Sequence, residues 1–107
     1  MNSNEKIALD EFVKKVKSEL GSNLLDMRLF GSKARGEFSS DSDIDILLIL
    51  TERNPESINK IVDILVDIQL EYDANISPVI YTEYEYKMNR EMGSLFVENV
   101  EKEGYPL

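Results

Sequence analysis

The sequence predicts one domain, residues 1–107, of the α/β (α+β) class, in which helices pack against a small mixed β-sheet. Hydrophobic periodicity switches several times between the helical and the strand pattern, which is typical of layered α/β proteins. Residues 43–50, DIDILLIL, are apolar on both faces after Ile46, as expected for a strand at the centre of a sheet. The segment from Phe30 to Asp43 is short for a parallel crossover, which favours a mixed sheet.

The first half of the chain predicts a helix, two strands and a short turn. Residues 3–20 read as an amphipathic helix that ends before Gly21. Its apolar positions are Ile7, Leu9, Phe12, Val13, Val16 and Leu20. Residues 24–30 alternate as a strand, and Gly31-Ser32 then opens a short helix or turn. A loop over residues 38–42 leads into the strand at 43–50.

The second half predicts three helices and a third strand. Asn54 and Pro55 form a good N-cap and first helical position for a helix over 55–72. Its apolar stripe consists of Ile58, Ile61, Val62, Leu65 and Ile68. Residues 76–81 read as a strand in which Pro78 removes one ladder donor, so we expect a sheet edge or a bulge there. A capping box at residues 82–85 opens a polar helix, and residues 94–104 form the last helix.

Composition excludes several classes of function. The chain has 12 Lys and Arg against 21 Asp and Glu, a net charge of −9, which argues against a general nucleic-acid surface. It has no His and no Cys, which excludes Ser-His-Asp and Cys-His nucleophiles and His-containing zinc sites. No apolar stretch approaches the ~20 residues of a membrane span. The absence of Cys favours the cytoplasm.

Two aspartates lead into the central strand. Side chains alternate along a strand, so Asp43 and Asp45 share one face, with Cα atoms roughly 6–7 Å apart. Their charges repel, and partial burial adds a desolvation cost. A divalent cation relieves both effects, and carboxylate oxygens suit Mg²⁺. The alternative is an acidic loop whose aspartates are solvated or paired with Lys33 and Arg35. Asp41 lies outside the pair and is expected to be a loop residue or helix cap.

Gly31 and Ser32 follow the first strand and precede the aspartate pair by some ten residues. A glycine lets a ligand approach the backbone, and a helix start presents free amides to phosphate. Ser32 adds a hydroxyl donor. The alternative is an ordinary turn with a Ser N-cap. Together, a phosphate cradle and a metal-binding pair indicate transfer of a phosphoryl or nucleotidyl group, which needs no His.

The motif GSKARGEFSSDSDIDILL resembles the G-S-x-A-R-G-x(n)-S-D-x-D-hydrophobic signature of the DNA-polymerase-β-like nucleotidyltransferase superfamily. Within it, the chain resembles the minimal nucleotidyltransferases (MNT domains), and LFVENVEKEGYPL is similar to their tail. The resemblance implies that Gly31 and Ser32 hold the triphosphate, that Asp43 and Asp45 are catalytic and bind Mg²⁺, and that Arg35 assists the phosphates or braces the loop.

The resemblance also implies a reaction and a partner. MNT domains are commonly partners of HEPN-type RNase toxins, and some silence the toxin by adenylylation. We therefore expect transfer of AMP from ATP to a protein hydroxyl, in an antitoxin. The alternative is a degenerate MNT domain that neutralises its partner by contact alone.

A third carboxylate, usual in the superfamily on a later strand, is not evident. Ser77 and Val79 occupy the expected parity, and neither can serve. Asp73, Glu83 and Glu85 flank the strand and would substitute only if the backbone bends. Tyr81, Tyr84 and Tyr86 fit a base-stacking platform less well than ordinary positions at a strand end and on a helix.

Overall fold

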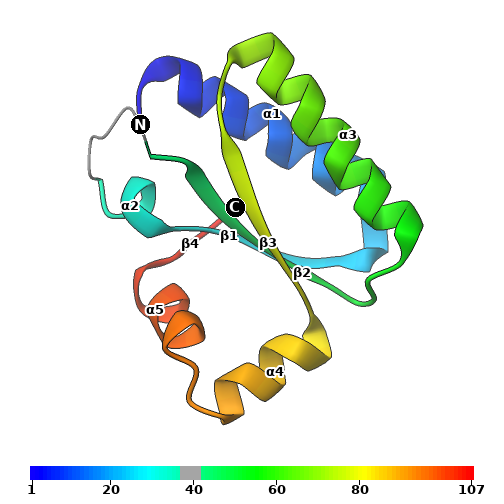
Figure 1. The fold of residues 1–107 in the computed structure, drawn as a ribbon, viewed down its shortest axis with the longest axis vertical. Helices are drawn as coiled ribbons and strands as arrows, with labels where there is room; N and C mark the ends of the chain where they lie inside the picture. The colour runs from blue at the N-terminus through cyan, green and yellow to red at the C-terminus, as the bar shows by residue number, and fades with distance from the viewer. Residues whose placement is uncertain (37–41) are drawn as a thin grey trace.

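A computed structural model describes residues 1–36 and 42–107 of the chain (Figure 1). In chain order the elements are α1 (Ser3–Leu20), η1 (Gly21–Asn23), β1 (Leu24–Phe30), α2 (Gly31–Ala34), β2 (Ile44–Leu50), α3 (Pro55–Tyr72), β3 (Ile76–Thr82), α4 (Glu83–Glu91), α5 (Leu95–Glu103) and β4 (Tyr105–Pro106). Asp41 lies outside the described residues. Among the described helices, none is long and apolar enough to cross a membrane.

The four strands form one mixed sheet in the order β3-β2-β1-β4. β1 pairs antiparallel with β2 and with β4, whereas β2 and β3 are parallel. The short connection after Phe30 returns as an antiparallel neighbour, and α3 supplies the crossover that a parallel pair requires. The predicted mixed sheet, with residues 43–50 at its centre and the Pro78 strand at its edge, is therefore confirmed.

Helices cover both faces of the sheet. α1 and α3 lie side by side on one face, and α4 and α5 lie on the other (Figure 1). The larger core contains residues from α1 and α3 together with Ile44, Ile46 and Leu48 of β2. Leu47 and Ile49 point the opposite way and pack with Val100 of α5. The strand period thus sends every second residue of β2 toward α4 and α5.

Helix starts follow the capping signals of the sequence. Asn54 accepts from the Ser57 amide at 2.7 Å and Pro55 is the first helical residue, as predicted. Thr82 and Glu85 form the predicted capping box at the start of α4. A second capping box, between Asn2 and Glu5, begins α1 and was not predicted.

The predicted apolar stripes were wrong at two positions. Ile7 and Val62 are largely exposed, although the periodicity placed both in the core. On α3, the buried positions are Ser57, Ile61, Ile64 and Ile68, so the helix contacts the core through a sector centred away from Val62. Hydropathy alone cannot distinguish an apolar residue of the core from one that faces outward.

Candidate functional site

The paired carboxylates lie where β2 begins. Asp45 is the second residue of the strand, and its side chain is partly buried on the face turned toward α4 and α5. Asp43 immediately precedes the strand and is exposed. Leu47 and Ile49 continue the same face inward and pack in the apolar cluster under α5. The site therefore stands at the polar entrance of an otherwise apolar face.

Gly31 lies directly against Asp45. It follows Phe30, which is the cross-strand partner of Asp45 in the β1–β2 ladder. Its φ of +76° is a conformation that side chains disfavour. A Cβ at this position would collide with the Oδ2 atom of Asp45. Two features therefore favour glycine at position 31: the positive φ of the backbone and the close approach to the Asp45 carboxylate.

Ser32 follows Gly31 in α2, a helix of a single turn. The helix begins without a side-chain cap, because Phe30 occupies the N-cap position. Ser32 itself is half-buried. The amides of this first turn and the Ser32 hydroxyl are donors that follow directly on Gly31, which lies against Asp45.

The two cations of α2 and its C-terminus have different surroundings. Lys33 is buried, and its Nζ lies 2.9 Å from Oε2 of Glu5, which ties α2 to the start of α1. Arg35 is exposed, and its Nη1 lies 3.4 Å from Oε2 of Glu103 at the end of α5. Burial and the charge of Asp43 raise the pKa of Asp45, and the Arg35 charge opposes this rise, so the guanidinium lies within electrostatic range of the carboxylate. The sequence offered both Lys33 and Arg35 as possible partners of the aspartates and did not predict their pairs with Glu5 and Glu103, because those residues are remote in the chain.

The electrostatics of Asp45 favour a bound cation. Burial and the charge of Asp43 raise the pKa of Asp45, and the Arg35 charge offsets this only in part. Within residues 1–36 and 42–107 there is no group of three Asp and Glu side chains that could hold a metal ion. Mg²⁺ is often held by one or two carboxylates together with substrate phosphates and water. The donor set of Asp43 and Asp45 fits such an ion.

The register of β3 decides which residue occupies the position of a third acid. Ser77 is the partner of Asp45 in the parallel ladder, whereas Val79 is the partner of Leu47. Val79 packs in the apolar cluster with Leu47. Of the two candidate positions, only Ser77 therefore adjoins the carboxylate pair.

The flanking acids that the sequence offered as substitutes have other surroundings. Glu83 begins α4 after the far end of β3, roughly 20 Å along the strand from Ser77. Glu85 pairs with Arg53 at 2.8 Å. Asp73 caps the end of α3 and accepts a hydrogen bond from Gln69 at 3.3 Å.

Of Tyr81, Tyr84 and Tyr86, only Tyr81 and Tyr86 pack in the apolar cluster. The Tyr81 ring lies 5.9 Å from that of Phe96, and Phe96 meets Phe30 edge-on at 5.1 Å. Tyr86 packs in the same cluster, and its hydroxyl donates to Glu101 at 3.0 Å. Tyr84 is exposed on α4. Tyr81 therefore lies at the end of β3, and Tyr84 and Tyr86 lie on α4. These are the ordinary positions that the sequence favoured over a base-stacking platform.

Comparison with known proteins places this geometry in a family. A family model described as "Nucleotidyltransferase domain" matches residues 9–104. "Putative protein adenylyltransferase MJ0604" of Methanocaldococcus jannaschii is 33% identical over 101 residues, which are 94% of this chain and 95% of that protein. "Putative protein adenylyltransferase MJ0141" of the same organism is 33% identical over 97 residues, covering 90% of this chain and 91% of the relative.

Solved structures share the fold at lower identity. "Structure of putative minimal nucleotidyltransferase" superposes with a TM-score of 0.61 at 21% identity, over 99% of this chain and 97% of the other. A "tri-AMPylated Shewanella oneidensis HEPN toxin in complex with MNT antitoxin" superposes with a TM-score of 0.55 at 14% identity, over 95% and 70% of the two chains. The resemblance to nucleotidyltransferases is thus confirmed by the family model, and the fold is similar to that of a minimal nucleotidyltransferase. Because the family model covers most of the chain and two relatives of nearly equal length share a third of its residues, the chain belongs to the nucleotidyltransferase domain family.

Proposed function

We propose that this chain is a Mg²⁺-dependent nucleotidyltransferase that transfers AMP from ATP to a hydroxyl group of a protein. The observation that carries the proposal is the close approach of Gly31 to Asp45 at the start of β2, with Asp43 and Arg35 nearby. The family match supports nucleotidyl transfer in general. Both relatives carry the name "Putative protein adenylyltransferase", which supports AMP and a protein acceptor.

Each residue of the site has a role in this proposal. The backbone at Gly31 and the hydroxyl of Ser32 donate to the triphosphate, which can approach closely because Gly31 has no side chain. Arg35 pairs with phosphate oxygens. Asp43 and Asp45 are the ligands of Mg²⁺, which when bound neutralises phosphate charge and orients the reacting groups. The acceptor oxygen forms a bond to the α-phosphorus, pyrophosphate leaves, and the hydroxyl proton passes to a base.

The identity of that base limits the expected rate. A general base typically contributes about 10²–10⁴-fold. Among the described residues, no third carboxylate joins Asp43 and Asp45, and Ser77 occupies the adjacent position. Turnover is therefore slow unless the acceptor brings its own base. Positioning of the substrates still accelerates the reaction.

We propose a HEPN-type toxin as the protein partner, which makes this chain an antitoxin of the cytoplasm. One solved structure of similar fold is described as a HEPN toxin in complex with an MNT antitoxin. A net charge of −9 fits a more basic partner. The second candidate function is neutralisation of the toxin by contact alone, and Ser77 beside Asp45 is the observation that favours it.

Labelled ATP separates the two candidates. The protein is incubated with ATP labelled at the α-phosphate, Mg²⁺ and a HEPN-type toxin, and label transfer is measured. We expect slow transfer by the wild type and none by Asp45→Asn. The control Asp10→Asn alters an exposed carboxylate of α1 and should behave as the wild type. A tight complex without any transfer would favour the contact mechanism.

Nucleotide binding is measured separately. Titration calorimetry with the ATP analogue AMP-PNP should give Mg²⁺-dependent binding to the wild type and not to Asp45→Asn. Unchanged affinity of Asp45→Asn would exclude the proposed metal site.

A further inference from the structure

α3 carries a second apolar face that its own core does not use. Val62, Val66 and Leu70 are four residues apart and thus lie along one side of the helix. They are 49%, 50% and 80% exposed. The core is contacted instead by Ile61, Ile64 and Ile68. We call the three exposed residues the α3 stripe.

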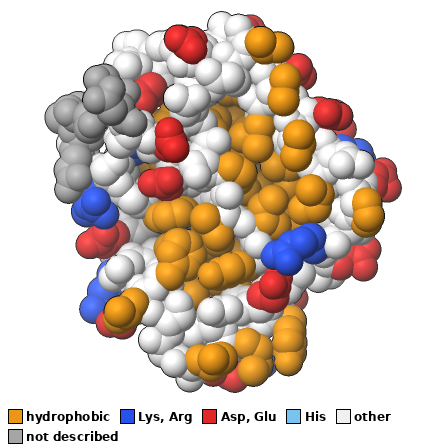
Figure 2. Space-filling view, viewed as in Figure 1, with side chains coloured by type: hydrophobic (Ala, Val, Ile, Leu, Met, Phe, Trp, Pro, Cys, Tyr) orange, Lys and Arg blue, Asp and Glu red, His pale blue; other side chains and the backbone are white. Residues whose placement is uncertain are grey.

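A groove joins the α3 stripe to β3. It has a volume of about 280 Å³ and is lined by Leu65, Val66, Gln69, Leu70, Asn75 and Ile76. Figure 2 shows hydrophobic side chains gathered on the face that carries β3 and the adjoining side of α3. The stripe and groove together form one surface, the α3–β3 surface, with the length of the helix as its long axis. Contiguous apolar surfaces of this kind mark interaction sites.

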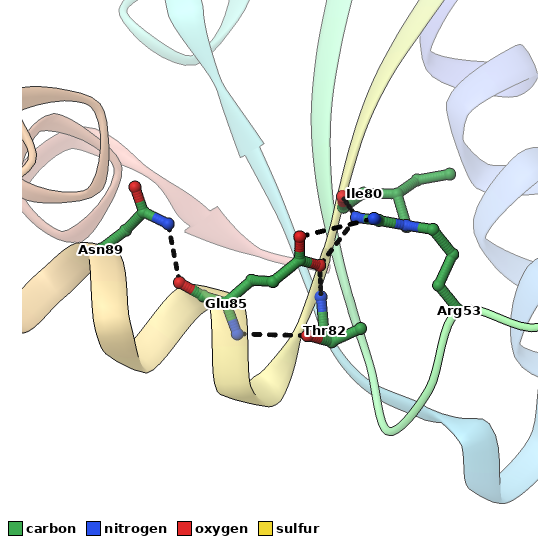
Figure 3. Close-up of polar contacts among 5 residues, drawn as sticks. All are labelled: Arg53, Ile80, Thr82, Glu85 and Asn89. Carbon is green, nitrogen blue, oxygen red and sulfur yellow. Dashed lines mark hydrogen bonds and ion pairs between the residues drawn. The ribbon is translucent and has the colours of Figure 1, made fainter.

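The C-terminal half of β3 is closed to pairing with another strand. Arg53 donates to the carbonyl of Ile80, and Glu85 accepts from the amide of Thr82 at 2.9 Å (Figure 3). Pro78, which shares their parity, has no N–H to offer. Backbone groups of equal parity face the same edge of a strand, so these three positions protect the free edge. A partner strand therefore cannot pair along this half of β3, and a partner contacts it through side chains.

Acidic side chains border the α3 stripe on the side away from β3. Glu56, Asp63 and Asp67 are exposed there. The nearby Lys60 is engaged with Glu56 at 3.2 Å and with the carbonyl of Glu19 at 3.3 Å. A second copy of this chain presents the same acids and a net charge of −9. The charge pattern thus favours a partner that supplies cations along one edge of an apolar face.

We propose that the α3–β3 surface docks an amphipathic helix of a partner protein, with Lys and Arg along one edge of its apolar face. This docking proposal depends on the proposed function in one respect: both expect that the chain binds another protein. α3 packs on the face of β2 that carries Ile46 and Leu48, whereas Asp45 points to the other face. A docked helix therefore leaves the carboxylate site open, and binding and chemistry are separable.

A synthetic helix tests the surface directly. The probe is a peptide of about 18 residues with Leu at helical spacing and Lys along one edge. The control peptide carries Glu in place of each Lys. Binding is followed by amide NMR shifts of the full chain. We expect the Lys peptide to shift resonances of α3 and β3, and the Glu peptide to bind at least about tenfold more weakly.

Substitutions locate the interaction. Val66→Glu should weaken binding of the Lys peptide at least about tenfold. The control Leu95→Glu alters a residue of α5 that is 74% exposed and should bind as the wild type. Thermal unfolding of both variants verifies that they are folded. Asp45→Asn should keep peptide binding and Val66→Glu should keep AMP-PNP binding, which distinguishes failure of this proposal from failure of the proposed function.

Three outcomes overturn the proposal. The first is that the Lys peptide, at millimolar concentration, shifts amide resonances only outside α3 and β3, or shifts none. The second is equal binding of the Lys and Glu peptides. The third is a wild-type dimer in sedimentation that Val66→Glu converts to a monomer, which would assign the surface to a second copy.

Discussion

At Gly31, both the backbone conformation and the contact with Asp45 restrict which side chain can be present. Its φ is +76°, and a Cβ would collide with the Asp45 carboxylate. Gly36 has the same φ of +76°, but a Cβ added there would have nothing within 4 Å. We expect Gly36→Ala to lower the free energy of unfolding by about 1–2 kcal/mol, from backbone strain alone. Gly31→Ala should cost about 2–4 kcal/mol, because the steric collision adds to the strain.

Urea unfolding of the two glycine variants checks this difference. Gly31→Ala should also lose AMP-PNP binding, since Asp45 must move, whereas Gly36→Ala should retain most of it. Equal losses of stability would show that the contact between Gly31 and Asp45 is not tight.

The sequence predicts the site residues that are close in the chain or joined by strand parity. Gly31 lies against Asp45 because Phe30, the residue before it, is the cross-strand partner of Asp45, and the charge of Asp43, which immediately precedes β2, acts on the same carboxylate. The role of Lys33 was not predictable, because its partner Glu5 belongs to a different helix. The choice between Ser77 and Val79 likewise required the register of β3, which no local pattern fixes.

At the scale of elements, the ion pair between Glu5 and Lys33 joins α1 to α2. Burial raises the pKa of Glu5, but hydrogen bonds from Lys33 and the Asn2 amide, together with positive charges nearby, outweigh it and the net pKa is lowered. The pair therefore stabilises the fold above the ordinary carboxyl pKa of 4.5. This stabilisation is lost as the pH falls from 4.5 through the lowered pKa of the folded state.

Glu5→Gln retains a capping side chain but removes the charge beside the buried ammonium. We expect it to lower the free energy of unfolding by about 2 kcal/mol at pH 7, with the difference from the wild type shrinking below pH 4.5. The control Glu11→Gln removes an exposed pair with Lys15 at 3.9 Å and should cost less than about 0.5 kcal/mol. Urea titrations across this pH range measure both. A constant difference at every pH would mean that Glu5 acts by packing and not by charge.

The pairing of β2 with β3 gives a test of the missing acid. Ser77→Asp places a carboxylate beside Asp45, and we expect it to raise label transfer at least about tenfold when Mg²⁺ is present. The matched variant Val79→Asp has the same parity, but it buries a charge against Leu47. It should cost about 3 kcal/mol of stability and give no gain in transfer. If Ser77→Asp leaves the rate unchanged although Mg²⁺ binds more tightly, activation of the hydroxyl does not limit the reaction.

The elements themselves were largely predictable because their ends carry local signals. Asn54 with Pro55 and Thr82 with Glu85 fix the starts of α3 and α4. β4 was not predicted, because two residues have no periodicity and form a strand only by pairing with β1. The exposed position of Val62 was missed because the stripe that faces solvent has the same composition as the core.

At the scale of the whole molecule, acidic residues outnumber basic ones by 21 to 12. Repulsion among the surface charges destabilises the compact state, and salt screens it over a Debye length of about 10 Å at 0.1 M. We expect the free energy of unfolding at pH 7 to rise by about 1 kcal/mol as KCl increases from about 20 to 500 mM. Near pH 4.4, the isoelectric point, the same series should have little effect. A decrease with KCl at pH 7 would show that the ion pairs outweigh the repulsion.

Mg²⁺ separates general screening from a specific site. At equal ionic strength, MgCl₂ should stabilise the wild type more than KCl does, because a ligand that binds only the folded state shifts the equilibrium. The excess should vanish in Asp45→Asn, whose own stability without metal should be higher than that of the wild type by about 0.5 kcal/mol. This gain is expected because burial and the charge of Asp43 raise the pKa of Asp45, so its ionised form is unfavourable at pH 7. An equal excess in both proteins would place the ion among the other surface carboxylates and remove the thermodynamic support for a metal at the start of β2.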